Sequence, residues 1–402
     1  MTTTDPTPRT YPFSAPDRLR LDPFYAELRK QEPVSRVRLP YGETAWLATR
    51  YSDVRTVFAD PRFSRAEAAE RDEPRARPTQ QRTGILTMDP PEHTRLRKLV
   101  AKAFTARRVE QLRPRAQRIA DDLVGRMRRK GAPLDLVEEF ALPLPITVIC
   151  ELLGVPYEDR DDFRVWSDAF LSTSKLSEQQ IEDYVAQMRA YMAGLVEQRR
   201  ARPEDDLLSG LIQARDEQDK LSETELLDLA VGLLVAGHET TATQIPNFVY
   251  VLLTHPAELE WLRNHSERVP EAVEELMRFV PLGVNAAFPR YALEDVELGG
   301  VLVRAGEPVL ASLASANRDE EVFERPEELN LARESNAHIG FGHGPHHCLG
   351  AQLARMELQV ALGTLLGELP ELRLGVAEQD VSWKSGMLVR GPQRLPVAWQ
   401  AG

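Results

Sequence analysis

Hydrophobic residues along the chain follow two different spacings. From about residue 94 to residue 262 they recur at the three- and four-residue intervals of amphipathic helices. Breaks in this pattern fall at Gly131-Ala132-Pro133, at Gly154-Val155-Pro156 and in the polar stretch Arg202 to Asp206. The longest predicted helix runs from about Ser222 to Leu253. The middle of the chain is therefore predicted to be helical.

Strand-like segments lie on either side of this helical region. Val34 to Leu39 and Thr44 to Thr49 predict a hairpin around Tyr41-Gly42. After Pro281, short apolar runs separated by Gly and Pro predict further strands, at Val296 to Val303, Pro308 to Leu313 and Val389 to Val397. No repeat or long linker marks a domain boundary. We predict one domain over residues 1–402, mainly α with small β-sheets (α+β), β-rich at about 30–60 and 281–402 and α-rich at about 90–280.

Composition and charge narrow the function classes. The chain has 402 residues, of which 42% are hydrophobic, and this is enough to bury a substantial core. The net charge of −12 argues against nucleic acid as a partner. The N-terminus lacks a secretory pattern, and the best apolar run, Leu229 to Gly237, is too short to span a bilayer. We expect a cytoplasmic monomer without a membrane partner.

The most informative segment is Phe341-Gly342-His343-Gly344-Pro345-His346-His347-Cys348-Leu349-Gly350. It places a cysteine in a glycine-rich turn directly before a helix-patterned run from Ala351 to about Leu366. A thiolate is a strong, soft iron ligand, and a helix N-terminus stabilises it. The glycines permit backbone conformations and close approaches that side chains would block. The other cysteine, Cys150, lies in an apolar stretch and is interpreted as core packing.

This segment resembles the haem-binding loop of cytochrome P450, Phe-Gly-x-Gly-x-His-x-Cys-x-Gly, at every specified position. The resemblance implies the P450 fold, with a long central helix over the haem (heme b). It makes Cys348 the proximal iron ligand, with Phe341, Gly342, His346 and Gly350 in the cofactor-binding loop. A lone cysteine is more often inert, but the full match outweighs that interpretation.

A second polar segment, Ala236-Gly237-His238-Glu239-Thr240-Thr241, interrupts the longest helix. Glu and Thr in the middle of an apolar helix need partners, water or a function. P450s carry Ala/Gly-Gly-x-Asp/Glu-Thr where this helix crosses the distal face of the haem. The resemblance therefore implies catalytic roles for Thr240, as a hydrogen-bonding partner of dioxygen, and for Glu239, as a proton relay. It also implies that Gly237 leaves space for the oxygen molecule.

The resemblance also assigns residues around the cofactor. His93, Arg97, Arg290 and His346 are expected to contact the haem propionates, for which arginine is well suited. Glu275 and Arg278, three residues apart on one predicted helix, match the structural Glu-x-x-Arg pair. This pair is expected to join a third residue, Arg318 or Arg325, and to hold the thiolate loop in register.

Within the family the chain resembles soluble actinobacterial P450s that tailor secondary metabolites. This implies a monooxygenase that uses O2 and two electrons from NAD(P)H, delivered through ferredoxin reductase and ferredoxin. A basic stretch, Arg95 to Lys130, holds 13 Lys and Arg against 3 Asp and Glu. It is either a solvated helix face or, in this family, a docking surface for an acidic donor. The candidate residues are Arg95, Lys98, Lys102, Arg107, Arg108 and Arg113.

The substrate is expected to be bulky and largely apolar, because most predicted pocket residues are aliphatic or small. A macrolide or other polyketide, hydroxylated or epoxidised, is favoured, and a terpenoid or xenobiotic is the alternative. A peroxide-using haem-thiolate enzyme and a non-catalytic haem protein remain as other classes. Expected contacts come from Arg65 to Thr87, Trp166 to Lys175 and Leu282 to Phe288, and the individual residues are Leu233, Leu234, Ala236, Val284, Ala286, Met387 and Leu388.

Overall fold

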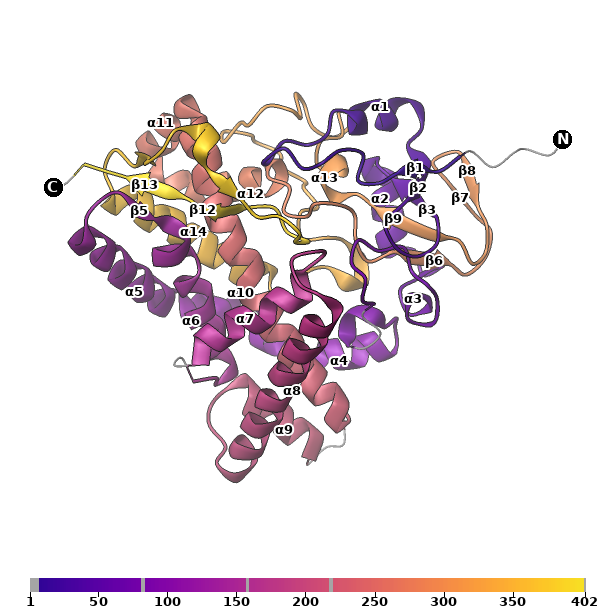
Figure 1. The fold of residues 1–402 in the computed structure, drawn as a ribbon, viewed down its shortest axis with the longest axis horizontal. Helices are drawn as coiled ribbons and strands as arrows, with labels where there is room; N and C mark the ends of the chain where they lie inside the picture. The colour runs from indigo at the N-terminus through magenta and orange to yellow at the C-terminus, as the bar shows by residue number, and fades with distance from the viewer. Residues whose placement is uncertain (1–6, 81–83, 157–158, 217–219, 401–402) are drawn as a thin grey trace. The chain divides into compact units, whose positions relative to one another are not determined.

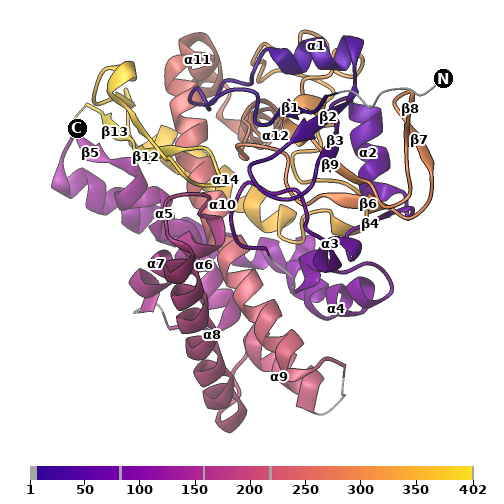
Figure 2. The same ribbon diagram turned by 45° about the vertical axis from the view of Figure 1, so that its right-hand side comes forward.

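The computed structural model (Figures 1 and 2) describes residues 7–80, 84–156, 159–216 and 220–400. Its contacts divide the chain into two compact units. The first unit comprises the chain up to Thr94 together with Met277–Leu329 and Ser335–Cys348. The second unit comprises the remaining segments, Arg95–Leu276, Asn330–Glu334 and the chain from Leu349 onward. Each unit is assembled from segments far apart in sequence, which explains why no boundary is visible in the sequence. The single domain over 1–402 stays a prediction.

A six-stranded sheet forms the centre of the first unit. The predicted hairpin is confirmed, because β2 (Val34–Arg38) pairs antiparallel with β3 (Ala45–Ala48). β3 also pairs in parallel with β9 (Pro308–Ala311), so the sheet joins strands from opposite ends of the chain. The order is β1-β2-β3-β9-β6-β4, with β1 (Arg9–Thr10) and β4 (Phe63–Ser64) at the edges and β6 (Arg290–Ala292) between β9 and β4.

Successive residues of β3 enter two separate apolar clusters, because neighbouring side chains in a strand point to opposite faces. Trp46 and Ala48 pack in the cluster that contains Val54 and Val57 of α2 (Tyr51–Ala59), while Leu47 packs in the cluster of Tyr11. Both faces of the strand are therefore buried, and its sequence is apolar throughout. The unit also contains α1 (Phe24–Gln31), α3 (Glu67–Glu70), α13 (Leu313–Ala316) and the hairpin of β7 (Val296–Leu298) and β8 (Val301–Val303).

Helices dominate the second unit, as predicted. The longest, α10 (Glu223–Thr254), begins after Ser222, whose side chain accepts from the backbone of Glu225 while the Glu225 side chain caps Ser222 in return. Predicted breaks coincide with helix ends at Gly131 and Gly154, both with positive φ. The other helices are α5 (Ala106–Lys130), α6 (Pro143–Leu153), α7 (Arg160–Leu171), α8 (Glu178–Ala201), α9 (Leu207–Asp216) and α11 (Pro256–Asn264).

α14 (Ala351–Glu368), the helix predicted after the cysteine loop, packs against α5 and α10 (Figures 1 and 2). The strand structure predicted within Val389 to Val397 consists of two short strands, and Leu395 between them donates its N–H to the Asp135 carboxylate. These strands join two small sheets, formed by β12 (Pro392–Arg394) with β11 (Ser382–Trp383) and by β13 (Pro396–Ala398) with β10 (Arg373–Leu374) and β5 (Leu134–Asp135).

Two further helices contribute residues to both units: α4 (Glu92–Ala101) and α12 (Val269–Phe279). Within the ranges that the structure covers, none of the helices combines the length and the apolar character that a membrane crossing requires.

Candidate active site

The cysteine loop of the first unit is a tight turn held by its own backbone. Cys348 is exposed, and its N–H donates to the carbonyl oxygen of Phe341 at 2.8 Å. Gly342 has a φ of 77°, in the left-handed region, and donates to Ile339 at 2.8 Å. Cys348 lies three residues before the start of α14 at Ala351, as the sequence predicted.

Glycine is required at one further position of this loop and not at another. At Gly344 the φ is 71°, and a Cβ would lie 2.3 Å from the carbonyl oxygen of Phe58 at the end of α2. Gly344 therefore lets the loop approach α2. At Gly350 the φ is −84°, and a Cβ would meet no described atom within 4 Å. The expectation that Gly350 serves an otherwise blocked conformation or approach is not supported by the described surroundings.

Arg290, in β6 beside this loop, carries a buried positive charge. Its side chain is 4% exposed, its guanidinium carbon lies 4.4 Å from the centre of the Phe58 ring, and within the described chain it has no ion pair. Burial, with a contribution from nearby Arg65, lowers the pKa of Arg290 to about 10. The nearby Asp89 carboxylate is engaged by the Ser64 hydroxyl at 2.5 Å. Arg290 is therefore a cation placed to receive another anion.

The His346 ring packs against the His93 ring, and the positive charge of Arg290 acts on it. The His93 and His346 ring centres are 4.2 Å apart, and the Nε2 atom of His346 is buried without a hydrogen bond from any described residue. Burial, Arg290 and His93 lower the pKa of His346 to about 3. These surroundings fit an acidic ligand, as the propionates of a haem would be. Arg97 is half-buried and lies four residues after His93 on α4.

A polar pair occupies the interior of α10 at the predicted catalytic position. His238 and Glu239 are 1% and 3% exposed, and His238 Nε2 lies 3.2 Å from Glu239 Oε1. The other ring nitrogen, Nδ1, lies 2.7 Å from the Leu234 carbonyl oxygen, so Nδ1 carries a proton and donates it. Burial alone would raise the pKa of Glu239, but His238, Lys384 and Arg164 outweigh it and hold that pKa below its ordinary value. Glu239 is therefore an anion at neutral pH.

Thr240 differs from its neighbours because it is only partly buried. Its hydroxyl donates to the Ala236 carbonyl oxygen at 3.0 Å, one turn earlier in the helix. The hydroxyl donor is used within the helix, and the oxygen keeps lone pairs with which it can accept a further hydrogen bond.

The role expected for Gly237 is corrected by the structure. A Cβ at this position would lie 2.6 Å from both Cγ1 and Cδ1 of Ile149 in α6. The space beside Gly237 is thus filled by a side chain of the neighbouring helix. Because Gly237 has no side chain, α10 and α6 can pack closely. The expectation that Gly237 leaves space for dioxygen did not consider this contact.

A buried carboxyl group that the sequence analysis missed lies in α14. Glu357 is completely buried, and neither carboxyl oxygen has a hydrogen-bond partner among the described residues. Burial raises the pKa of Glu357 well above its ordinary value, and the Thr241 hydroxyl of α10 offsets this only in part. Its surroundings therefore favour the protonated, neutral form of Glu357. No motif signals such a group, because its ionisation depends on packing between two helices.

Two of the predicted substrate-contacting segments meet in the second unit. The Gly386 carbonyl oxygen accepts the backbone N–H groups of residues 173–175, and the Leu388 N–H donates to the Leu171 carbonyl oxygen at 2.7 Å. Met387 and Ser172 form an isolated antiparallel β-bridge. The C-terminal loop with Met387 and Leu388 is therefore tied to the segment that follows α7. In α10, Leu234 is buried, Leu233 is half-buried and Ala236 is exposed.

The two individual residues predicted to contact substrate in the first unit, Val284 and Ala286, differ in burial. Val284 is half-buried. Ala286 is buried in the core cluster of Tyr11 and Leu310, and its N–H donates to the Tyr11 hydroxyl at 2.6 Å. The side chain of Ala286 is committed to the core, which argues against the predicted substrate contact. Of the predicted loop Arg65 to Thr87, residues 81–83 lie outside the described residues.

The Glu275 carboxylate has a partner other than those considered from the sequence. It pairs with Arg333 at 3.0 Å and accepts the N–H of Asn330, also at 3.0 Å. Arg278 donates to the carbonyl oxygens of Asn317, Pro326 and Glu328. Each of these two α12 side chains thus holds an irregular segment in place, which fits a structural role for both residues.

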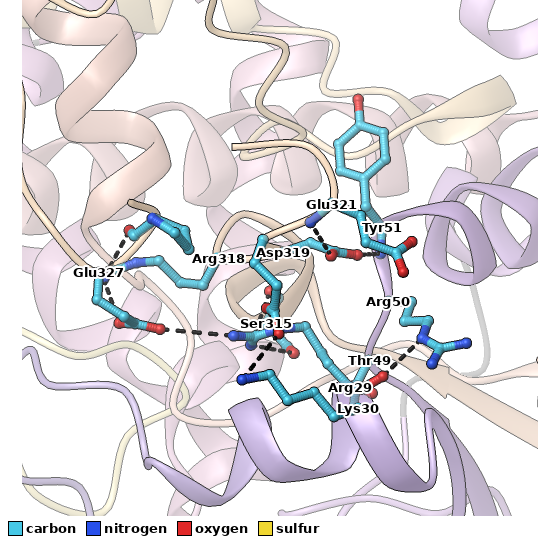
Figure 3. Close-up of polar contacts among 12 residues, drawn as sticks. Arg29, Lys30, Thr49, Arg50, Tyr51, Ser315, Arg318, Asp319, Glu321 and Glu327 are labelled. Atoms are coloured by element: carbon cyan, nitrogen blue, oxygen red, sulfur yellow. Dashed lines mark hydrogen bonds and ion pairs between the residues drawn. The ribbon is translucent and has the colours of Figure 1, made fainter. Parts of the chain in front are cut away.

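Arg318 and Arg325, the two partners that had been considered, pair elsewhere. Arg318 donates to Glu327 at 2.7 Å, within the polar cluster of Figure 3 in which Asp319 accepts the N–H of Tyr51. Arg325 is exposed and pairs with Glu328 at 3.0 Å. The third residue was missed because Arg333 lies in a loop without local pattern.

The six candidate docking residues fall into two groups, those with an ion pair and those without one among the described residues. Arg95 pairs with Glu225, and Arg113 pairs with Glu110 at 2.7 Å. Four others are exposed and have no ion pair with any described residue. They are Lys98, Lys102, Arg107 and Arg108, and the last three line a surface hollow with Thr105 and Gln111.

Comparisons with known proteins agree with these observations. The family model "Cytochrome P450" matches residues 18–174 and 161–370. The chain is 58% identical to mycinamicin IV hydroxylase/epoxidase of Micromonospora griseorubida, over 98% of this chain and 99% of that protein. It is 53% identical to nocardicin C N-oxygenase of Nocardia uniformis subsp. tsuyamanensis, over 99% and 100%.

Solved structures show the same relationship. A crystal structure of HinD with NMFT and NO has a TM-score of 0.96 and 52% identity, covering 98% of this chain and all of that one. A variant of the mixed-function P450 MycG in complex with mycinamicin V has a TM-score of 0.91 and 58% identity with the same coverage. Membership of one family accounts for the cysteine loop, the polar segment of α10 and the mainly α fold. The chain therefore belongs to the cytochrome P450 family of monooxygenases.

Proposed function

We propose that this chain hydroxylates or epoxidises a bulky, largely apolar natural product, and that its substrate is a macrolide or another polyketide. The observation that carries the proposal is the 58% identity, end to end, to a protein named mycinamicin IV hydroxylase/epoxidase. A second relative, cytochrome P450 monooxygenase PikC of Streptomyces venezuelae, is 44% identical over 94% of this chain and supports the monooxygenase activity.

The cofactor proposed for this chain is haem b, which supplies the iron that activates dioxygen. Cys348 is proposed as the proximal thiolate ligand, in a loop whose other cofactor-binding residues are Phe341, Gly342 and Gly350. Arg290 and His346 are proposed to bind the propionates, because the Arg290 side chain and the His346 Nε2 atom are buried without a carboxylate partner in the described chain. His93 and Arg97 complete the proposed set.

Glu239 and Thr240 are proposed to move protons during the reaction. Glu239 is ionised in the helix interior and can accept a proton and pass it on. Thr240 keeps an acceptor oxygen while its own proton is directed to Ala236. Leu233, Ala236, Val284, Met387 and Leu388 are proposed to contact the substrate.

The electrons are proposed to come from NAD(P)H through ferredoxin reductase and an acidic ferredoxin. Of the six candidate residues, the four without ion pairs are favoured as the docking surface, because their charge is not neutralised locally. Arg95 and Arg113 contribute less, since each is already paired with a glutamate.

The test is a binding and turnover comparison on the purified holoenzyme. We expect mycinamicin IV to shift the haem from low to high spin, and reduced ferredoxin with O2 to give a product with one added oxygen atom, detected by mass spectrometry. Nocardicin C serves as the comparison substrate because of the 53% identical N-oxygenase. A spin shift and product with nocardicin C alone would reject the macrolide proposal.

The alternative classes give different outcomes in the same assay. Turnover with peroxide but never with reduced ferredoxin would indicate a peroxide-using enzyme. Oxidation of NAD(P)H without product from macrolides, terpenoids or nocardicin C would indicate a different substrate class. A terpenoid substrate stays the alternative, supported by pentalenic acid synthase of Streptomyces avermitilis at 39% identity over 98% of this chain.

A further inference from the structure

Lys384 is a lysine that turns toward the interior of the second unit. It follows β11 in the C-terminal hairpin, and its Nζ donates to the Thr243 hydroxyl of α10 at 2.9 Å. Thr243 is itself almost completely buried. Burial lowers the pKa of Lys384, although Glu239 and Asp168 act in the opposite direction. A lysine ammonium group is rarely placed in such surroundings, because loss of hydration disfavours its charge.

The contact places Lys384 on one particular face of α10. Glu239, Thr243 and Asn247 follow one another at four-residue intervals, so their side chains share a face of the helix. A Cβ at Gly391 would lie 2.7 Å from the Thr243 methyl group, and the Asn247 amide donates to the Arg390 carbonyl oxygen at 2.9 Å. The C-terminal segment therefore lies directly along the face that carries Glu239.

The charges around Glu239 are not equally available to it. Arg164 of α7 acts on Glu239, but Glu138 binds its guanidinium group at 2.6 and 2.8 Å. Lys175, in the loop after α7, is bound by Asp168 at 2.6 Å.

His238 contacts Glu239 directly, and on the opposite side of α10 the carboxyl group of Glu357 in α14, whose pKa is raised by burial, faces Thr241. Lys384 has a neutral hydroxyl as its hydrogen-bond partner and, among the described residues, no ion pair. Unlike the charges of Arg164 and Lys175, the charge of Lys384 is not neutralised by another carboxylate of the described chain.

We propose that Lys384 is a positioning residue for proton delivery, whose ammonium group, anchored on Thr243, keeps Glu239 ionised beside His238. The inference rests on the proposed function of Glu239 as the proton relay. A neutral Glu239 would hold its proton instead of accepting one from the surroundings, so loss of the Lys384 charge would interrupt the relay at its carboxylate. Lys384 acts through Glu239 and is not required to touch the substrate.

The test compares three variants of the holoenzyme: Lys384→Met, Lys384→Arg and Lys130→Met. Lys130 is the matched control, because it pairs with a different carboxylate, Glu139, at the surface. The first readout needs no turnover. It is the infrared band of the protonated Glu239 carboxyl, identified by its absence in Glu239→Gln and followed against pH. Removing a positive charge raises the pKa of a carboxyl group, so the band is expected to form at higher pH in Lys384→Met, and at the parent's pH in the other two.

The second readout is product formed per NAD(P)H across the same pH range. In the parent, product per NAD(P)H is expected to fall toward acidic pH. We expect this fall to move to higher pH in Lys384→Met, with a severalfold loss of product in that pH range. Lys384→Arg is expected to restore the parent profile. Thr243→Val keeps the charge and removes only the anchor, so its profile is expected to stay closer to the parent than that of Lys384→Met.

An unchanged carboxyl titration in Lys384→Met would overturn the proposal. It would also be overturned if Thr243→Val reproduced the full effect and Lys384→Arg failed to rescue it, since Lys384 would then act only as a tether. Unchanged product per NAD(P)H in Glu239→Gln would instead contradict the proposed function of Glu239, and the infrared titration would still decide whether Lys384 controls its charge.

Discussion

Replacement of Gly237 by alanine tests whether this glycine packs two helices or leaves room for dioxygen. The new methyl group would lie 2.6 Å from two carbon atoms of Ile149, about 1 Å closer than the ~3.5–4.0 Å of normal carbon contacts. Ile149 is fully buried and, as a β-branched residue in a helix, has little rotamer freedom. Overpacking of this kind costs about 1–3 kcal/mol, whereas alanine gains about 0.8–1.0 kcal/mol over glycine in a helix. We expect a net destabilisation of about 0–2 kcal/mol.

The sign should reverse when Ile149 is removed. Ile149→Ala alone is expected to cost about 2–5 kcal/mol, because it leaves a cavity in a buried contact. In that background the methyl group of Gly237→Ala meets no obstacle, and only the helix gain of about 1 kcal/mol remains. The coupling energy between the two positions is then about 1–3 kcal/mol, the size of the removed overpacking.

The assay is equilibrium urea unfolding of the holoenzyme, followed by circular dichroism with the slopes compared between variants. Gly232→Ala is the matched control, since it lies in the same helix and its Cβ would meet nothing within 4 Å. It should stabilise by about 0.8–1.0 kcal/mol in both backgrounds. The packing explanation is refuted if Gly237→Ala stabilises as Gly232→Ala does. Slower carbon monoxide binding at unchanged stability would restore the original expectation of space for dioxygen.

Four further predictions concern the site and its surroundings. Cys348→Ala should abolish the red-shifted Soret band of the reduced carbon monoxide complex, and a retained band would remove Cys348 as the ligand. Thr240→Ala should keep the substrate-induced spin shift while diverting electrons to peroxide, measured as product and peroxide per NAD(P)H; unchanged product yield would remove Thr240 from proton delivery. Charge reversal at the four unpaired basic residues should slow reduction by ferredoxin and flatten its dependence on ionic strength, whereas the same reversals at Arg118, Arg126 and Arg129, farther along α5, should not. Equal reduction rates at low salt would return the patch to a solvated surface. Because burial favours the protonated form of Glu357 in the folded protein and the group ionises on unfolding, the parent should lose stability relative to Glu357→Gln as pH rises above 4.5, and a pH-independent difference in urea unfolding would contradict its raised pKa.

Local chemistry made much of the fold predictable from the sequence. The helical region ends where Gly131 and Gly154 adopt positive φ, and α10 begins at the capping pair of Ser222 and Glu225. These signals act within a few residues, so they can be recognised without knowledge of the partner segments. The cysteine loop was predictable for a different reason, because its residues match a family pattern.

Contacts between distant segments could not be predicted in the same way. Lys384 reaches Thr243, and Glu275 reaches Arg333, only because hairpins and loops without periodic pattern bring them together. Gly237 shows a second limit. A glycine in a helix is compatible with a nearby ligand or with a close helix, and only the position of Ile149 decides between them.

The parallel pairing of β3 with β9 has a consequence for how the protein is made. Trp46 of β3 pairs with Val309 of β9, so one edge of β3 has no partner until the ribosome has passed residue 309. At about 5–20 residues per second this interval is on the order of 10–50 s. During this interval the hairpin of β2 and β3 exposes an unpaired, fully apolar edge strand, and such an edge can pair with other chains. The cysteine loop emerges later still, so any nascent chain that captures haem through Cys348 has already had time to close this sheet.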